Sequence, residues 1–263
     1  MAGLLADGRW PVLLLVLLAA VGAGAINTLV GSGTLLTFPV LLAVGLPPVS
    51  ANITNNVGLV VGSITGTWGY RRELTGQWRR LARLAGFSAA GGLLGALLLL
   101  QLPGEVFAAV VPALVALAVV LVLVGPRLNA WAEKRAEADR APSRAAGVAL
   151  AGGVFGAGVY GGYFGAAQGV LLIGVLDLGL TETLQRINAL KNALATIVNG
   201  LATVVFVVAA PSQVSWSLVA ILAPGALLGG VLGARFGRRL PAVVLRGIIV
   251  VVGIVAIAIL ISR

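Results

Sequence analysis

Long apolar runs, separated by short polar or glycine-rich stretches, dominate the hydrophobic pattern of the chain. Runs near 10–30, 53–70, 84–102 and 104–125 are each long enough for a helix across a bilayer, because about 20 apolar residues span a hydrocarbon core of roughly 30 Å. The run 34–46 is shorter and would cover only about 20 Å as a helix. The pattern predicts helices of membrane-spanning length with one short helix among them.

The second half of the chain repeats this order, with runs near 145–164, 167–180, 189–210, 215–236 and 242–261, of which the second is again short. Aligning Gly31 with Gly165 also superposes Gly-Leu at 45–46 on Gly-Leu at 179–180, and GGLLGA at 91–96 later matches GGVLGA at 229–234. A duplicated unit is therefore predicted. We expect a first repeat over 1–125, a linker over 126–144 and a second repeat over 145–263.

Composition makes this an integral membrane protein: 59% of residues are hydrophobic, 10% are charged and the mean hydropathy is +1.07. The absence of Cys and His excludes disulfides, Cys/His zinc sites and histidine acid–base chemistry. We therefore expect no cofactor, no metal and no enzymatic activity. No basic stretch interleaves with aromatic residues, so the net charge of +10 indicates loop orientation rather than nucleic-acid binding.

Arginine-rich stretches at 71–83, 126–144 and 235–246 are expected on the cytoplasmic side. Counting crossings between them places both termini outside and makes the two repeats inverted. The runs 145–164 and 167–180 must then both span or together form a re-entrant hairpin. The predicted fold is an all-α polytopic protein of the inner cell membrane. It has two inverted repeats, each with four long segments and one short broken segment, and about 8–10 segments in all. Inverted repeats with paired, glycine-interrupted short segments are typical of secondary transporters.

Several sequence blocks carry a resemblance to a known family. The first repeat has LLAVGLPP followed by ANITNN, the second has YGGYFGAAQG followed by DLGL, and both have GG-x-LGA followed by Leu-Pro. In this order the chain resembles the sulfite exporter TauE/SafE family, also called the toluene sulfonate uptake permease family, over nearly its whole length. The resemblance implies transport of sulfite, sulfoacetate, sulfonates or related anions, and of other carboxylates in some members.

The two glycine-rich breaks are the first candidates for an anion site. A free helix N-terminus offers backbone N–H groups to an anion, and glycine lets the anion approach closely. If each break starts a short helix, inversion would bring both to the centre. The alternative is that these glycines only pack helices, which we expect for the rows at Gly58, Gly62, Gly66 and Gly225, Gly229, Gly233. The break residues are Gly31, Ser32, Gly33, Thr34, Gly161 and Gly162.

Polar side chains after and beside the breaks are the second group of candidates. Asn52, Thr54, Asn55 and Asn56 could donate to anion oxygens or instead cap a helix, and Tyr160 and Gln168 flank the second break. Lys191 and Asn192 fall in the equivalent place in the second repeat if a further two-residue offset is allowed. Lys191 is either an intramembrane cation or a lysine that reaches the surface. Asp177 could pair with Lys191, carry a coupling proton or face water.

The leading hypothesis is a secondary transporter, an exporter of small sulfur-containing anions. An anion channel or facilitator and a permease for small carboxylates are alternatives, and dependence of flux on a proton gradient separates transporter from channel. A membrane-embedded enzyme and a structural subunit are less favoured. The absence of a G-x-x-x-x-G-K-[ST] sequence argues against ATP hydrolysis by this chain. The expected partners are a small anion and the lipid bilayer, with no nucleic acid, and a homodimer is left open.

Overall fold

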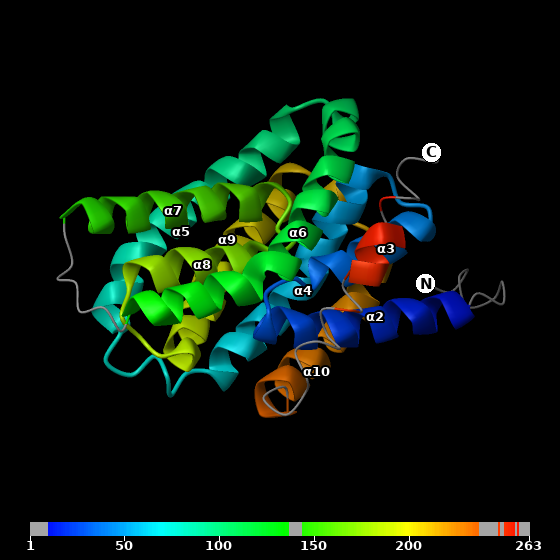
Figure 1. The fold of residues 1–263 in the computed structure, drawn as a ribbon. Coiled ribbons are helices and arrows are strands. Elements are labelled where there is room, and N and C mark those ends of the chain that lie inside the picture. The colour runs from blue at the N-terminus through cyan, green and yellow to red at the C-terminus, as the bar shows by residue number, and fades with distance from the viewer. Residues whose placement is uncertain (1–9, 137–143, 237–246, 248–249, 256, 258–263) are drawn as a thin grey trace.

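In the computed structural model, every regular element among the described residues is helical (Figure 1). The structure describes residues 10–136, 144–236, 247, 250–255 and 257, and side chains outside 126–145. The predicted all-α fold is confirmed. The helices are α2 (Trp10–Leu29), α3 (Thr34–Ala43), α4 (Pro48–Gly69), α5 (Trp78–Gln101), α6 (Gly104–Ala136), α7 (Arg144–Tyr163), α8 (Gln168–Gly179), α9 (Leu184–Ala209), the short 3₁₀ helix η1 (Pro211–Gln213) and α10 (Trp216–Phe236).

Five of these helices are long and apolar enough to cross a membrane: α2, α5, the Gly104–Gly125 part of α6, α9 and α10. The two short apolar helices, α3 and α8, have 10 and 12 residues and would cover only about 15 and 18 Å. Large apolar side chains such as Leu18, Val120 and Val208 point outward and are more than half exposed. In a bilayer these side chains contact lipid. The multi-pass membrane architecture is confirmed.

The short helices belong to two hairpins, α2–α3 and α7–α8, that turn back at the same local structure. Gly31 and Gly165 have φ values of 77° and 78°, a conformation that glycine adopts without steric cost. Their N–H groups donate to the carbonyls of Ile26 and Tyr160, both at 3.1 Å, which satisfies carbonyls left free at a helix end. Gly31 and Gly165 are 134 residues apart in the sequence, and so are their acceptors Ile26 and Tyr160, which is the offset of the predicted repeat. The orientation of each repeat in the membrane stays a prediction.

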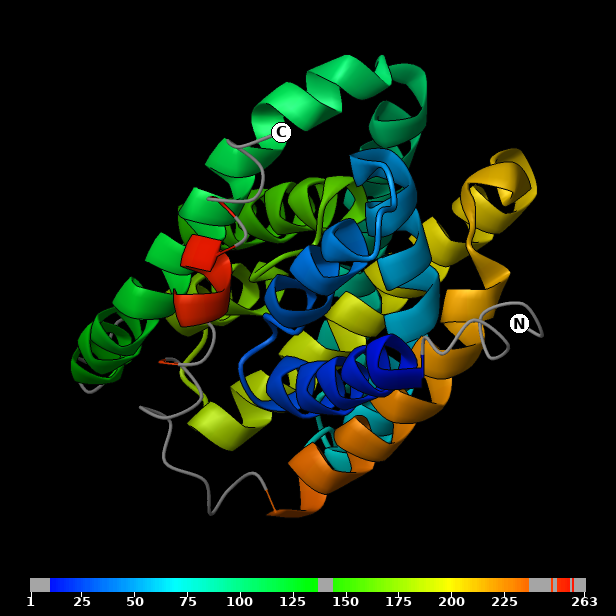
Figure 2. The same cartoon turned by 90° about the vertical axis from the view of Figure 1, so that its right-hand side faces the viewer.

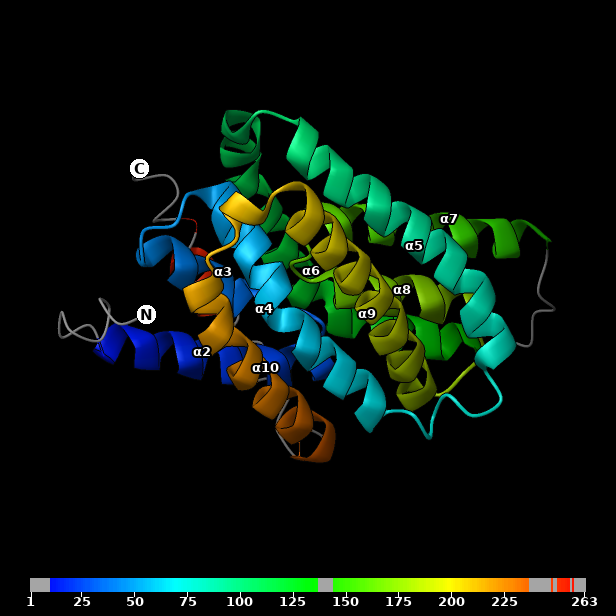
Figure 3. The same ribbon diagram turned by 180° about the vertical axis from the view of Figure 1, so that it is seen from behind.

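Helices α10, α4, α9 and α5 lie side by side in that order (Figure 3), and each hairpin packs against this layer. The most extensive helix contacts are those of α5 with α7 and of α10 with α2. The fourth helix of each predicted repeat therefore packs on the hairpin of the other repeat. In Figure 2, α6 runs along the outside of the bundle, where it contacts α8 and α4. The helices of the two predicted repeats thus share one bundle.

Close helix contacts explain the glycine rows. A Cβ on Gly229 would lie 2.0 Å from the carbonyl oxygen of Val21, and one on Gly62 would lie 2.8 Å from that of Ala226. Gly162 meets the carbonyl of Gly92 in α5 at 2.1 Å in the same way. The predicted packing role of the rows is confirmed, because only glycine permits backbones at these distances.

Two predicted segments fall partly outside the described residues. The predicted linker 126–144 begins within α6, which stays helical to Ala136, and 137–143 are not described. Most of the predicted last segment, 242–261, is also outside the described residues.

Candidate functional site

The tips of the two hairpins touch in the middle of the bundle. The N–H of Gly169, in the first turn of α8, donates to the carbonyl of Gly31 at 3.0 Å. A Cβ on Gly31 would lie 2.3 Å from the Cα of Gly169, so a side chain at this position would separate the tips. In Figure 1, α2 extends inward from the right and α7 from the left, and both hairpins turn back near the centre. The two breaks expected to meet do lie together.

A pocket lies beside this contact, with an empty volume of about 390 Å³ including the space that opens to solvent. Its lining residues include two pairs at the 134-residue offset of the predicted repeat, Gly31 with Gly165 and Thr34 with Gln168, together with Leu59 and Ala195. The others are Asn27, Asn55, Asn56, Phe164, Gly169 and Asn199. The pocket is therefore built where the two hairpins meet. Among the described residues that line it, none carries a carboxylate.

Gln168 supplies a free donor to this pocket. Its side chain is only 2% exposed, and its Nε2 has no hydrogen-bond partner among the described residues. The side chain lies over Gly161, where a Cβ would approach the amide of Gln168 to 2.2 Å. A buried amide N–H without a partner is costly, and an anion oxygen in the pocket would satisfy it.

Asn55 and Thr34 form the side of the pocket that faces α3. The Nδ2 of Asn55 donates to the Oγ1 of Thr34 at 3.1 Å, and its Oδ1 accepts a bond from the hydroxyl of Thr37. Because Thr37 takes the Asn55 oxygen, the amide nitrogen is directed toward the start of α3. This fixed orientation presents donors rather than acceptors at the first turn of a helix, where the positive end of its dipole also favours an anion.

A row of polar side chains joins α2, α4 and α9 beside the pocket. The Nδ2 atoms of Asn27 and Asn199 both donate to the Oγ of Ser63 at 3.2 Å. Asn56 donates to the Oδ1 of Asn199 at 3.5 Å and accepts from the hydroxyl of Thr203 at 2.9 Å. Polar groups at this depth are stable because they bond to one another. This row fixes the amides that line the pocket.

Lys191 is fully buried and holds the end of α2. Its Nζ donates to the carbonyl oxygens of Thr28 at 3.0 Å and Asn27 at 3.3 Å. The Nδ2 of Asn192 donates to the same Thr28 carbonyl at 3.2 Å. An ammonium at a helix C-terminus complements the negative end of the dipole. The alternative of a lysine that reaches the surface is wrong, because the side chain is fully buried and its Nζ is bound to backbone carbonyls of α2.

Several candidates bind neighbouring backbone instead of lining the pocket. The Nδ2 of Asn52 donates to the carbonyl of Tyr163 at 2.9 Å, and Thr54 accepts from the N–H of Ser215 at 3.0 Å. The expectation that this cluster caps its own helix is wrong, because α4 starts at Pro48 and the cluster lies in its interior. Thr54 contacts the residue just before α10 instead.

The remaining candidates lie near the tips but outside the pocket lining. Gly161 and Gly162 belong to the last turns of α7, so the second break starts later than expected, after Tyr163. Ser32 and Gly33 are buried at the first tip. The hydroxyls of Ser32 and Tyr160 have no hydrogen-bond partner among the described residues.

Asp177 lies nine residues beyond Gln168 in α8, or about 14 Å along the helix axis, and is partly exposed. The partners of Lys191 are the two carbonyls of α2, so the expected pairing with Asp177 is not the one observed.

Phe164 closes the pocket on its apolar side. Its ring packs edge to face on Phe38 at 5.3 Å between centroids and on Tyr160 at 6.5 Å. Phe164, Asn27 and Asn199 were not among the expected site residues. Each lone asparagine in an otherwise apolar run was a usable signal, since a polar side chain inside a membrane segment suggests function.

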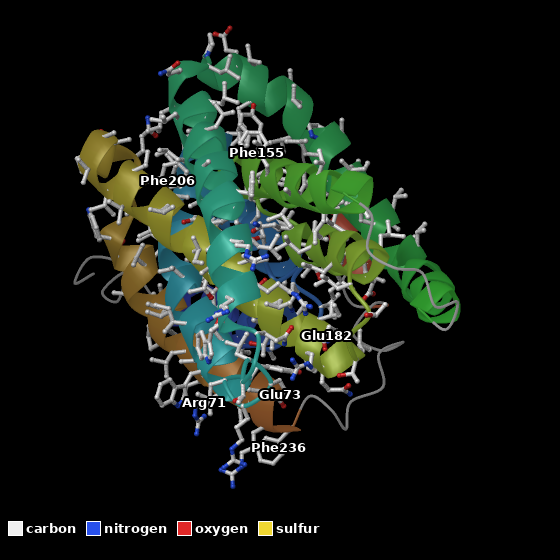
Figure 4. All side chains as sticks on the ribbon, turned by 90° about the vertical axis from the view of Figure 1, so that its left-hand side faces the viewer. Arg71, Glu73, Phe155, Glu182, Phe206 and Phe236 are labelled. Atoms are coloured by element: carbon white, nitrogen blue, oxygen red, sulfur yellow. The ribbon has the colours of Figure 1, made fainter. Side chains whose placement is uncertain are left out.

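An ionic cluster lies away from the tips, where α5 begins and α8 connects to α9. Glu182 pairs with Arg80 and with Arg186, both at 2.6 Å, and Arg186 also donates to the carbonyl of Thr75. Burial favours a higher pKa for Glu182, but the bonds from Arg80 and Arg186 outweigh it and hold the pKa below its ordinary value. Figure 4 shows Arg71, Glu73 and Glu182 toward the same end of the bundle.

Comparisons with known proteins agree with this architecture. The model of the family described as sulfite exporter TauE/SafE matches residues 16–260. The chain is 32% identical to Probable membrane transporter protein YfcA of Escherichia coli K12 over 242 residues, which cover 88% of this chain and 81% of that protein. No solved structure matches.

A second relative, Probable membrane transporter protein ORF9 of a Sinorhizobium species, is 35% identical over 106 residues. That match covers 40% of this chain and 41% of the relative. The family match spans nearly every described helix, both hairpins and the pocket between them. The chain therefore belongs to the sulfite exporter TauE/SafE family of membrane transporters.

Proposed function

We propose that this protein is a secondary transporter that exports a small sulfur-containing anion, such as sulfite or sulfoacetate, across the inner cell membrane. The observation that carries the proposal is the pocket at the hairpin tips, where the buried amide of Gln168 has an unpartnered donor. Amide donors and a helix N-terminus suit a sulfonate or sulfite group, whose oxygens accept several hydrogen bonds.

The position of the pocket also favours transport of the anion over binding without transport. It lies where two broken helices meet, an arrangement in which one hairpin can move against the other around a bound ligand. The described part of its lining offers hydrogen-bond donors but no charged side chain. Such a site can bind an anion and still release it, as transport requires. The family's name supports the sulfur-containing class, and export is the direction that this name describes.

A ligand panel on the purified protein tests the proposal. Sulfite, sulfoacetate, taurine, thiosulfate and short carboxylates are added in turn, and the shift in thermal stability is measured, because a ligand of the folded state raises it. We expect sulfite or sulfoacetate to stabilise the protein and taurine, whose amine is cationic, to do so less. Stabilisation by carboxylates alone would instead favour a carboxylate permease.

Gln168→Leu tests the pocket itself. A hydrogen bond to a charged group contributes about 1.5–3 kcal/mol, so anion affinity should fall by about 10- to 150-fold. Gln101→Leu, on the exposed end of α5, is the matched control and should retain affinity. Equal affinity in Gln168→Leu and wild type would remove the pocket as the binding site.

Flux into proteoliposomes then separates a transporter from a channel. An imposed proton gradient should drive accumulation of the anion against its own gradient in a coupled transporter. A channel or facilitator would only equilibrate it.

A further inference from the structure

Lys191 is the one charged side chain that is fully buried among the residues whose side chains the structure describes. It touches two residues of the pocket lining. Its Nζ binds the carbonyl of Asn27, and its Cδ lies 3.0 Å from the position of a Cβ on Gly169. The backbone of these two residues therefore lies between the charge of Lys191 and the pocket where an anion would bind.

The ammonium occupies a position suited to a coupling cation. Free carbonyls at the end of a broken helix are groups that bind Na⁺ or H⁺ in transporters built from such helices. Here the carbonyls of Asn27 and Thr28, at the end of α2, are bound by Lys191. At the end of α7 the carbonyl of Tyr163 instead receives the neutral amide of Asn52. The two helix ends therefore differ: carbonyls at the end of α2 bind a side chain that can gain and lose a proton, whereas the carbonyl at the end of α7 binds a neutral amide.

The helices packed against α9 supply few other ionisable groups. Neither α2 nor α4 has an ionisable side chain, and α7 contributes Tyr160 and Tyr163 together with Arg144 at its start. On α8 only Asp177 is ionisable, eight residues beyond Gly169 and so about 12 Å along the axis. The arginines of α5 lie in its first turns, with Glu182 and Arg186 at the same end: Arg79, Arg80 and Arg83.

We propose that Lys191 carries the coupling proton, and that its protonation and anion binding in the pocket favour one another. This inference rests on the proposed function. A buried ammonium with only carbonyl partners is costly, and an anion nearby in a medium of low dielectric reduces that cost. The proton joins the Nζ as the anion enters and leaves the neutral amine when the anion departs. The anion and the proton then cross together with less net charge than the anion alone, so that in export the outward gradient of the anion carries the proton out with it.

Calorimetry of anion binding measures this proton directly. Sulfoacetate and methanesulfonate are the probes, because both keep their charge between about pH 6 and about pH 9. Titration of the full chain in two buffers of different ionisation enthalpy gives the number of protons taken up per anion. We expect uptake of up to about one proton toward alkaline pH, with affinity falling by up to about tenfold per pH unit there.

Two variants at the same position separate a proton carrier from a structural lysine. Lys191→Arg stays charged throughout this range, so it should bind with no proton uptake and with an affinity independent of pH. Lys191→Met should bind more weakly, also without uptake. A structural lysine would lower thermal stability in both variants but leave the uptake per bound anion unchanged.

Asp177→Asn tests the rival carrier and should keep the uptake of the wild type. Anion binding without proton uptake in the wild type, or undiminished uptake in Lys191→Arg, would overturn the inference. Loss of uptake in Asp177→Asn, with uptake kept in Lys191→Arg, would assign the proton to Asp177. If neither probe binds the wild type at any pH, the proposed function fails and this inference with it.

Discussion

At the scale of single residues, Gly31 at the hairpin tip is required for two separable reasons, and Gly45, in the α3–α4 connection, shares only one of them. Gly31 and Gly45 both have positive φ, at 77° and 102°. A side chain on Gly31 would meet the backbone of Gly169, whereas one on Gly45 would have nothing within 4 Å. The same substitution at the two positions therefore separates backbone strain from loss of the tip contact.

We predict that Gly31→Ala abolishes anion binding while Gly45→Ala retains it. Both variants should lose about 1–2 kcal/mol of unfolding free energy from the left-handed backbone conformation. Only Gly31→Ala must also push α8 away and widen the pocket. Thermal stability and anion affinity are measured on both purified variants. Similar affinities in the two variants would show that the tip contact does not shape the site.

At the scale of helices, close glycine contacts join the two repeats. Helix α10 lies against α2 through Gly225, Gly229 and Gly233, and α5 lies against α7 through Gly91 and Gly95. Lipid tails are as apolar as these helices, so the association depends on close packing rather than on a hydrophobic driving force. A larger side chain at one of these glycines therefore acts on the assembly of the bundle.

We expect Gly229→Leu to reduce expression and thermal stability, because its Cβ would lie 2.0 Å from the carbonyl oxygen of Val21. Overpacking of this kind costs about 1–3 kcal/mol or more. Gly86→Leu, at an exposed glycine of α5 with nothing within 4 Å, is the control. Any folded Gly229→Leu protein should keep wild-type ligand selectivity. A stable variant with altered selectivity would instead assign Gly229 to the site.

The junction of α5 with the α8–α9 connection should be sensitive to acid. The folded-state pKa of Glu182 is lowered, so its contribution to stability is present above the pKa of the unfolded chain. That contribution is lost as the pH falls through the lower folded-state value. Melting temperature should therefore drop more on acidification in wild type than in Glu182→Gln, which should already be less stable at neutral pH. Glu105→Gln, on the exposed first turn of α6, should follow the wild-type profile.

At the scale of the whole molecule, the ionic cluster constrains topology. Arg80 and Thr75, near the start of α5, contact Glu182 and Arg186, near the start of α9. The connections α4–α5 and α8–α9 therefore lie on the same side of the bundle. This agrees with the expectation that α7 and α8 cross together or not at all. The arginines there favour the cytoplasmic side.

We predict that Thr75→Cys is shielded and Ser212→Cys is labelled when intact cells receive an impermeant thiol reagent. Thr75 lies in the α4–α5 connection and Ser212 in η1, and both are exposed. The chain has no cysteine of its own, so labelling reports the introduced residue alone. Permeabilised cells, in which both should react, are the control. Labelling of Thr75→Cys alone in intact cells would reverse the predicted orientation.

Much of the fold could be predicted because its causes are local or compositional. The helices cover the predicted apolar runs, although α4, α5 and α9 begin five or six residues before theirs. The short helices α3 and α8 lie within the short runs 34–46 and 167–180. The internal match paired Gly31 with Gly165, and these two residues share one backbone conformation. Asn27 and Asn199 of the pocket were not predicted, because a lone asparagine marks a polar position in an apolar run but does not show that its helix face lines a pocket.

The sequence by itself determined the membrane class, the positions of the breaks and the polar residues near them, because hydropathy and backbone preference act within a few residues. Only the tertiary structure decided which helix lies opposite each polar group. It directs Asn55 toward α3, Asn52 toward the end of α7 and Lys191 toward the end of α2. The contacts of Asn52 and Lys191 join residues more than a hundred positions apart in the sequence, and only the packing of the helices brings such residues together.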